Sequence, residues 1–303
     1  MRNFENRPAI IRSAINHHPF TTTPDISVAK AIEMMKDTYS SCLLVLADGE
    51  PNSLLVGLFT QRDVVRLAAS GVDWYNLSLA SVMTTQLITI KETEAQDILA
   101  VVRQFRQHRI RHLPVVGEEG NLIGLITHQS IRESIQPADL FKQKQVSEVM
   151  SSRVIYAFET TSILEVAQMM NKERVSCVVI VEQMTLNEGK ITSANIPESA
   201  FVSNPQTLLF PVGIITERDI VQFCHLELDL DHILAEEVMS TPLLPIQQSD
   251  SLWTAHKIMQ QHQVRRLVVS GDQGELQVLS LQLAYLKRLN RWKFRKLWIL
   301  CKI

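Results

Sequence analysis

One pattern of ten residues occurs twice in this chain. "VGLFTQRDVV" spans residues 56–65, and "VGIITERDIV" spans residues 212–221. Two altered copies follow the same phase, "IGLITHQSI" at 123–131 and "QVLSLQLAY" at 277–285. The anchor of the pattern therefore falls at positions 57, 124, 213 and 277. A repeat of this length indicates that one supersecondary unit has been copied along the chain and that neighbouring copies share a core.

Other features recur in step with this anchor and predict the content of each unit. Amphipathic helical patterns span 26–37, 94–108, 162–173 and 250–262, with apolar residues at helical spacing. A short apolar strand pattern follows each of them, at 41–48, 111–118, 176–183 and 265–272. Each unit thus reads strand–helix–strand–strand–helix, which places the chain in the α/β class, of the α+β type with βαββα repeats.

A unit of about 60 residues is too small to bury a core by itself, so we expect the four repeats to form two pairs. The first pair is predicted at 14–135, with repeats at 14–72 and 78–135, and the second at 146–286, with repeats at 146–228 and 233–286. An arm (1–13), a linker (136–145) and a tail (287–303) remain. Residues 184–210 form an insertion rich in Ser, Asn, Thr and Pro, which is typical of a surface loop.

The repeats differ in an odd–even fashion. Copies one and three share Ser-Cys at the second strand and Thr-x-Arg-Asp after the third strand. Copies two and four carry basic pairs at the second strand instead, Arg111-His112 and Arg265-Arg266. In place of the Asp they have Ser130 and Leu283. This alternation favours two pseudo-symmetric pairs, each made of one odd and one even repeat.

The repeated polar residues suit the recognition of a sugar and a phosphate. A threonine hydroxyl where a strand meets a helix can bind a phosphate oxygen at the helix N-terminus. An ionised carboxylate such as Asp63 or Asp219 can accept from two hydroxyl groups, as a ribose offers. Arginine offers donors that fit phosphate. The alternative is structural, because the same Thr residues can cap their helices and the acids can oppose the helix dipole.

Taken together, these residues resemble the CBS domain, the module named after cystathionine β-synthase. The marks are Gly-x-x-Thr-x-x-Asp after the third strand, Val-Met before the first, and second strands such as "RHLPVV". The resemblance covers about residues 14–286 and implies two Bateman pairs, which in this family commonly bind AMP, ADP, ATP or S-adenosylmethionine. Mg²⁺ is a candidate companion of the nucleotide. The resemblance implies that Asp63 and Asp219 bind the ribose and that the basic pairs bind the phosphate. The site residues it implies are Thr60, Arg62, Asp63, Thr127, Ser130, Thr216, Arg218 and Asp219, with Arg111, His112, Arg265 and Arg266 as phosphate ligands; the fourth copy, lacking Gly and Asp, is expected to be empty.

Composition excludes several other classes of function. The net charge of −2 implies no general attraction to nucleic acid. The four cysteines lack zinc-site spacing, and no Ser-His-Asp set, Gly-rich phosphate loop or HExxH motif is present, so no catalytic or metal-binding residue is expected. The polar N-terminus and the lack of an apolar run of about 18 residues predict a cytoplasmic protein.

We therefore expect a regulatory ligand sensor rather than an enzyme, acting as a homodimer or on an effector protein. Two alternatives remain: the sensory part of a longer signalling enzyme such as a histidine kinase or cyclase, or a dimerisation scaffold with vacant clefts. Residues 287–303 are basic and aromatic, without an acid. This tail is interpreted as an extension of the closing helix of repeat four or as an altered end, with contact to an anionic membrane as the third possibility.

Overall fold

The computed structural model describes residues 13–50, 53–96, 98–134, 144–150, 154–185, 207–264, 266–270 and 276–279. These residues belong to two compact units, one made of 1–136 with 221–227 and the other of 137–220 with 228–303. The tail, the basic residue Arg265, most of the linker and the first twelve residues lie outside the described part.

The first repeat shows how this sequence builds one unit. Helix α2 begins after Ser27, whose hydroxyl accepts a hydrogen bond from the Lys30 backbone N–H at 3.2 Å. The helix buries Val28, Ala31, Ile32 and Met35, which form one face. Strand β2 is parallel to β1 and antiparallel to β3. The elements are β1 (Thr21–Thr22), α2 (Val28–Asp37), β2 (Cys42–Leu46), β3 (Leu55–Thr60) and α3 (Gln61–Ser70).

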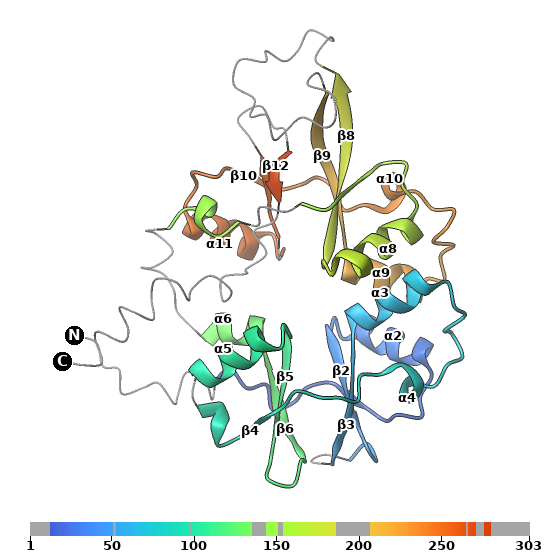
Figure 1. Cartoon of the computed structure of the whole chain (residues 1–303), viewed down its shortest axis with the longest axis vertical. Helices are drawn as coiled ribbons and strands as arrows, with labels where there is room; N and C mark the ends of the chain where they lie inside the picture. Colours follow the sequence, from blue (N-terminus) through green and yellow to red (C-terminus); the bar gives the residue numbers. More distant parts are fainter. Residues whose placement is uncertain are drawn as a thin grey trace, which may run out of the picture. The chain divides into compact units, whose positions relative to one another are not determined.

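The other three repeats follow the same order, each around its own three-stranded sheet (Figure 1). The second repeat has α4 (Leu79–Val82), β4 (Ile90–Lys91), η2 (Glu94–Gln96), α5 (Ile98–Gln107), β5 (His112–Val116), β6 (Leu122–Thr127) and α6 (His128–Ser134). The third has η3 (Val146–Glu148), β7 (Tyr156–Phe158), α8 (Ile163–Glu173), β8 (Cys177–Thr185), β9 (Thr207–Thr216) and α9 (Glu217–His225). The fourth has α10 (Ala235–Val238), β10 (Pro245–Ile246), α11 (Leu252–Gln261), β11 (Val268–Ser270) and β12 (Leu276–Leu279). The predicted βαββα unit is confirmed in three copies, and in the fourth up to its last strand.

Within each pair, the residues that precede the first strand of one repeat pair with the other repeat. Asn16 and Leu125 exchange two backbone hydrogen bonds of 2.9 Å, so the start of the first repeat adds to the sheet of the second. Thr84, at the start of the second repeat, pairs in the same way with Leu58. In the second pair, Ser240 pairs with Ile214. We call these stretches crossing segments; they join the two repeats of a pair through backbone hydrogen bonds.

The motif glycines lie directly under the crossing segments. A Cβ atom at Gly124 would lie 2.7 Å from the backbone oxygen of Asn16. A Cβ atom at Gly57 would collide with the Met83 sulfur, and one at Gly213 with the sulfur of Met239. The close neighbour of each of these three glycines is therefore the crossing segment of the partner repeat.

The insertion in the third repeat differs at its ends from the predicted loop. Strand β8 continues through Thr185 and β9 begins at Thr207, so both strands extend into the range 184–210 as an antiparallel ribbon (Figure 1). Leu209 is buried there against Val179, Val181 and Val268. The polar composition of the range as a whole concealed this apolar strand end.

The last two residues of the predicted linker contact the second pair. The backbone N–H of Leu252 donates to the oxygen of Lys144 at 2.8 Å, and Gln145 forms a bridge with Ser251. Residues 144–145 thus belong to the second pair. No helix in the described part of the chain is long and apolar enough to span a membrane.

Candidate functional site

The Thr and Asp of the repeated motif form the N-terminal caps of α3 and α9. The backbone N–H and hydroxyl of Thr60 donate to Asp63 Oδ2 at 2.9 and 2.8 Å. The same two donors of Thr216 lie 2.7 and 2.8 Å from Asp219 Oδ2. The capping interpretation is confirmed for both repeats. It leaves the second carboxylate oxygen, Oδ1, outside the cap, so capping and ligand binding are chemically compatible.

The second repeat makes the same cap with hydroxyl groups alone. The backbone N–H of Thr127 donates to Ser130 Oγ at 2.9 Å, and the backbone N–H of Ser130 donates to Thr127 Oγ1 at 3.0 Å. Because a serine hydroxyl carries no charge and one oxygen, it holds two ribose hydroxyls less well than a carboxylate does.

The odd and even repeats of each pair meet at the N-terminal ends of their second strands, β2 with β5 and β8 with β11. In the first pair, Ser41 Oγ and His112 Nε2 are 2.7 Å apart. In the second pair, the Arg266 guanidinium donates to Ser176 Oγ at 2.7 Å. Ser41 and Ser176 hold equivalent positions, as do His112 and Arg266, so the same odd–even contact occurs in both pairs. Two of the four predicted phosphate-binding residues, His112 and Arg266, thus lie beside the Ser-Cys strands of the odd repeats.

Arg266 has spare hydrogen-bonding capacity. Its Nε atom is buried and has no hydrogen-bond partner among the described residues. A buried donor without an acceptor costs free energy, and in native proteins it calls for a specific explanation. An anionic oxygen bound beside Ser176 would supply the acceptor.

Asp219 lies within electrostatic reach of this arginine. Burial raises the pKa of the Asp219 carboxyl above its ordinary value of 3.8, because water no longer solvates the charged form. Hydrogen bonds from Thr216 and the charges of Arg266 and Arg218 act in the opposite direction on this pKa. An acid of the third repeat and a guanidinium of the fourth are therefore close enough to influence each other.

The raised pKa gives a stability prediction for Asp219→Asn. The folded protein binds this proton more tightly than the unfolded chain, so the group favours folding at low pH and loses that contribution as the pH rises through the folded-state pKa. At pH 7 the buried carboxylate opposes folding. We expect Asp219→Asn to raise the free energy of unfolding by about 1 kcal/mol at pH 7, the usual scale for relieving a strained functional site.

Urea unfolding at pH 7 and at pH 4.5 measures this effect. The gain should shrink at pH 4.5, where the wild-type carboxyl is more protonated. Asp63→Asn is the matched control, because Asp63 forms an ion pair with Arg66 that the substitution removes, and we expect it to lower stability. A loss at pH 7 from Asp219→Asn equal to that from Asp63→Asn would contradict the prediction.

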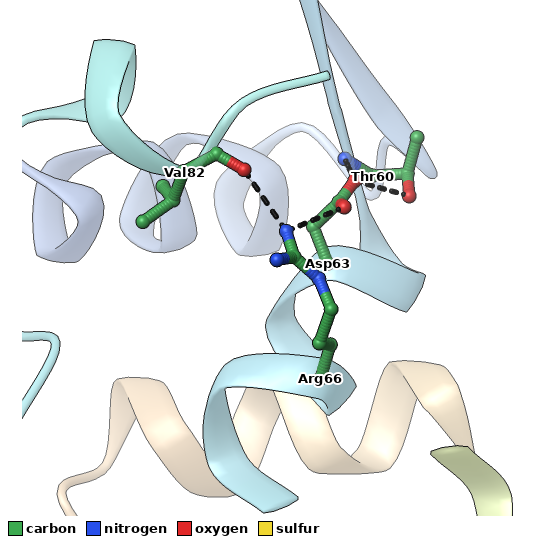
Figure 2. Close-up of polar contacts among 4 residues, drawn as sticks. All are labelled: Thr60, Asp63, Arg66 and Val82. Carbon is green, nitrogen blue, oxygen red and sulfur yellow. Dashed lines mark hydrogen bonds and ion pairs between the residues drawn. The ribbon is translucent and has the colours of Figure 1, made fainter. Parts of the chain in front are cut away.

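Asp63 differs from Asp219 in forming an ion pair with a residue of its own helix, Arg66. Figure 2 shows the Arg66 guanidinium between Asp63 and the backbone oxygen of Val82. Its Nη2 atom lies 3.0 Å from Asp63 Oδ1 and 2.9 Å from the Val82 oxygen. Both oxygens of this carboxylate are thus engaged within the protein.

The positions of the other predicted site residues give less information about ligand binding. Arg62 and Arg218 are exposed in the first turns of α3 and α9, and Arg111 is half-buried at the start of β5. Sequence reasoning assigned no role to Ser41 and Ser176, although the repeated Ser-Cys pair marked them. It also missed Arg66, for which the repeat gave no signal because no equivalent copy carries it.

The described residues define a protein of four related modules, three of them complete βαββα units and the fourth described up to its last strand. In both pairs, a residue at the start of the even repeat's second strand contacts a serine of the odd repeat. The CBS domain model matches residues 11–70, 79–137, 146–193 and 235–277. The chain belongs to the CBS domain family.

Several known proteins are similar to this chain. The crystal structure of protein MJ1225 from Methanocaldococcus jannaschii, described as a putative archaeal homolog of g-AMPK, covers 91% of this chain and 98% of its own at 20% identity, with a TM-score of 0.72. Inosine-5'-monophosphate dehydrogenase of Nitrosopumilus maritimus is 32% identical over 137 residues, 44% of this chain. A CBS domain protein from Pyrobaculum aerophilum, solved complexed with AMP, is 27% identical over 51% of this chain, with a TM-score of 0.36. The chain spans only 26% and 23% of the first two curated enzymes it matches, and 59% of the protein MJ1404 of Methanocaldococcus jannaschii.

Proposed function

We propose that this chain is a regulatory protein that binds an adenine nucleotide between the third and fourth repeats. Asp219 accepts hydrogen bonds from the ribose hydroxyls, and Arg266 donates to the phosphate. The observation that carries the proposal is Arg266 itself. It is oriented by Ser176, lies within electrostatic reach of Asp219, and has a buried Nε–H without an acceptor in the described part of the chain.

The two groups complement opposite ends of a nucleotide. Asp219 Oδ2 is used by the helix cap, whereas Oδ1 receives no hydrogen bond from any described residue. A carboxylate oxygen aimed at a diol and a guanidinium aimed at a phosphate are both charge-assisted interactions. Bound phosphate would also offset the charge that Arg266 carries in a half-buried place.

The same two contacts rank the candidate ligands by expected affinity. AMP, ADP and ATP each carry phosphate for Arg266, whereas S-adenosylmethionine offers a carboxylate and a positively charged sulfonium. We expect the phosphate-bearing ligands to bind more tightly, and adenosine, which keeps only the ribose contact, to bind weakly. The adenine preference rests on membership of the CBS family.

Binding in this place would act as a regulatory signal. A ligand held by one residue from each repeat favours the packing of the pair in which both contacts form. That bias becomes useful when it is linked to a second site, on an effector protein, a fused domain or a second copy of the chain. We therefore propose a non-catalytic, sensory role.

The test is calorimetric titration and thermal unfolding of the full chain with AMP, ADP, ATP, S-adenosylmethionine and adenosine. Ligand at 100 times Kd should add about 2.7 kcal/mol of stability and raise Tm. Asp219→Ala or Arg266→Leu should weaken binding at the second pair by about 10- to 100-fold, the scale of a lost charge-assisted hydrogen bond. Lys172→Ala, in the last turn of α8, is the control and should bind as the wild type does.

Two results would count against the proposal. Equal binding by the wild type and both variants would remove these residues from the site. If no member of the panel raised Tm, the repeats would instead act as a dimerisation scaffold.

A further inference from the structure

The two motif acids occupy the same place in two repeats but differ in what surrounds their second oxygen. Asp63 Oδ1 accepts from Arg66 Nη2 at 3.0 Å, while Oδ2 accepts from Thr60. The side chain of Asp63 is 12% exposed and that of Arg66 is 50% exposed (Figure 2). The ion pair therefore caps an almost buried acid from the solvent side.

The equivalent position in α9 carries no charge. Arg66 stands three residues after Asp63, and the residue three after Asp219 is Gln222. Within the described residues, no hydrogen bond reaches Asp219 Oδ1, although the Thr216 cap is the same. One acid is thus internally paired and the other keeps an available oxygen.

We propose that Arg66 is an affinity-setting residue: it competes with ribose hydroxyls for Asp63, so that ligand fills the second pair first and the first pair only at higher concentration. The inference rests on the proposed function, because it concerns which of two equivalent acids a nucleotide reaches. Exposed ion pairs are weak, and the competition is correspondingly modest, about twofold to fivefold in affinity. An effect of that size separates two otherwise similar sites into a sensitive one and a less sensitive one.

The geometry also links binding at Asp63 to the crossing segment. The same Arg66 nitrogen donates to the Val82 oxygen at 2.9 Å, at the end of α4. Met83, the next residue, lies over Gly57. A ribose that displaces Arg66 from Asp63 therefore disturbs the contact that holds α4 to α3. The less sensitive site is in this way tied to the packing of its two repeats.

The sequence offers a reciprocal exchange as the test. Arg66→Gln gives the first pair the residue of the second, and Gln222→Arg places the competing cation three residues after Asp219. Each is measured in a background where the other acid is removed, by calorimetric titration of the full chain with AMP and with ATP. In the Asp219→Ala background, Arg66→Gln should tighten binding about twofold to fivefold. In the Asp63→Ala background, Gln222→Arg should weaken it by a similar factor.

Arg66→Lys in the Asp219→Ala background is the control for charge. It keeps a cation near Asp63 and should leave the affinity close to that of Arg66, which separates competition from a general loosening of α3. Unchanged affinity after Arg66→Gln, or no binding in the Asp219→Ala background with either residue at 66, would overturn the inference while leaving binding at Asp219 intact. Failure of the wild-type chain to bind any nucleotide would overturn the proposed function and this inference together.

Discussion

Gly124→Ala is expected to lower the free energy of unfolding by about 3 kcal/mol. The added Cβ atom would lie 2.7 Å from the backbone oxygen of Asn16 and 2.6 Å from Ile15 Cγ2. Because that oxygen belongs to the main chain, the crossing segment must move away from β6 to make room. The two hydrogen bonds between Asn16 and Leu125 would then stretch, adding their loss to the cost of overpacking.

Urea unfolding of the full chain measures this cost, and Gly57→Ala is its matched control. Its added methyl group would collide with the end of the Met83 side chain, which can change rotamer. We expect Gly57→Ala to cost about 1 kcal/mol. If the two substitutions lowered the free energy of unfolding equally, the backbone of the crossing segment at Gly124 would not be the rigid obstacle that the prediction assumes.

Phe59→Ala is expected to have the largest effect, about 3–5 kcal/mol. Phe59 is fully buried in β3, opposite Leu43 of β2. Its removal deletes apolar contacts and leaves a cavity that the surrounding sheet and helices fill only in part. The midpoint of urea unfolding, followed by circular dichroism, should fall accordingly.

Phe20→Ala provides the comparison for this substitution. Phe20 lies in the same repeat, but it is 46% exposed, so we expect a loss below about 1 kcal/mol. A loss from Phe59→Ala no greater than that from Phe20→Ala would contradict the assignment of Phe59 to the core.

The repeated unit could be predicted because the residues that mark it lie close together along the chain. Gly57, Thr60 and Asp63 recur at fixed spacing in a second copy, and the strand–helix–strand–strand–helix order followed from that register and from apolar periodicity. The capping role of Thr60 and Asp63 could also be predicted, since a cap involves residues only three positions apart.

Contacts between distant residues were less accessible. The packing of Met83 on Gly57 depends on which repeat the crossing segment joins, and spacing along the chain does not specify this. Arg66 was missed for the opposite reason: a comparison of repeats emphasises what the copies share, whereas Arg66 matters because Gln222 stands at its place. The strand end at Leu209 was hidden within a polar stretch.

The exchanged crossing segments have a consequence for how such chains lengthen. A single module added to the chain would have one sheet edge without a crossing segment on it. Its own crossing segment would have no sheet to pair with. Two modules added together would satisfy each other at once. Duplication of two modules at a time is therefore the route that this architecture permits most readily. The unit that is copied is the pair rather than the single module.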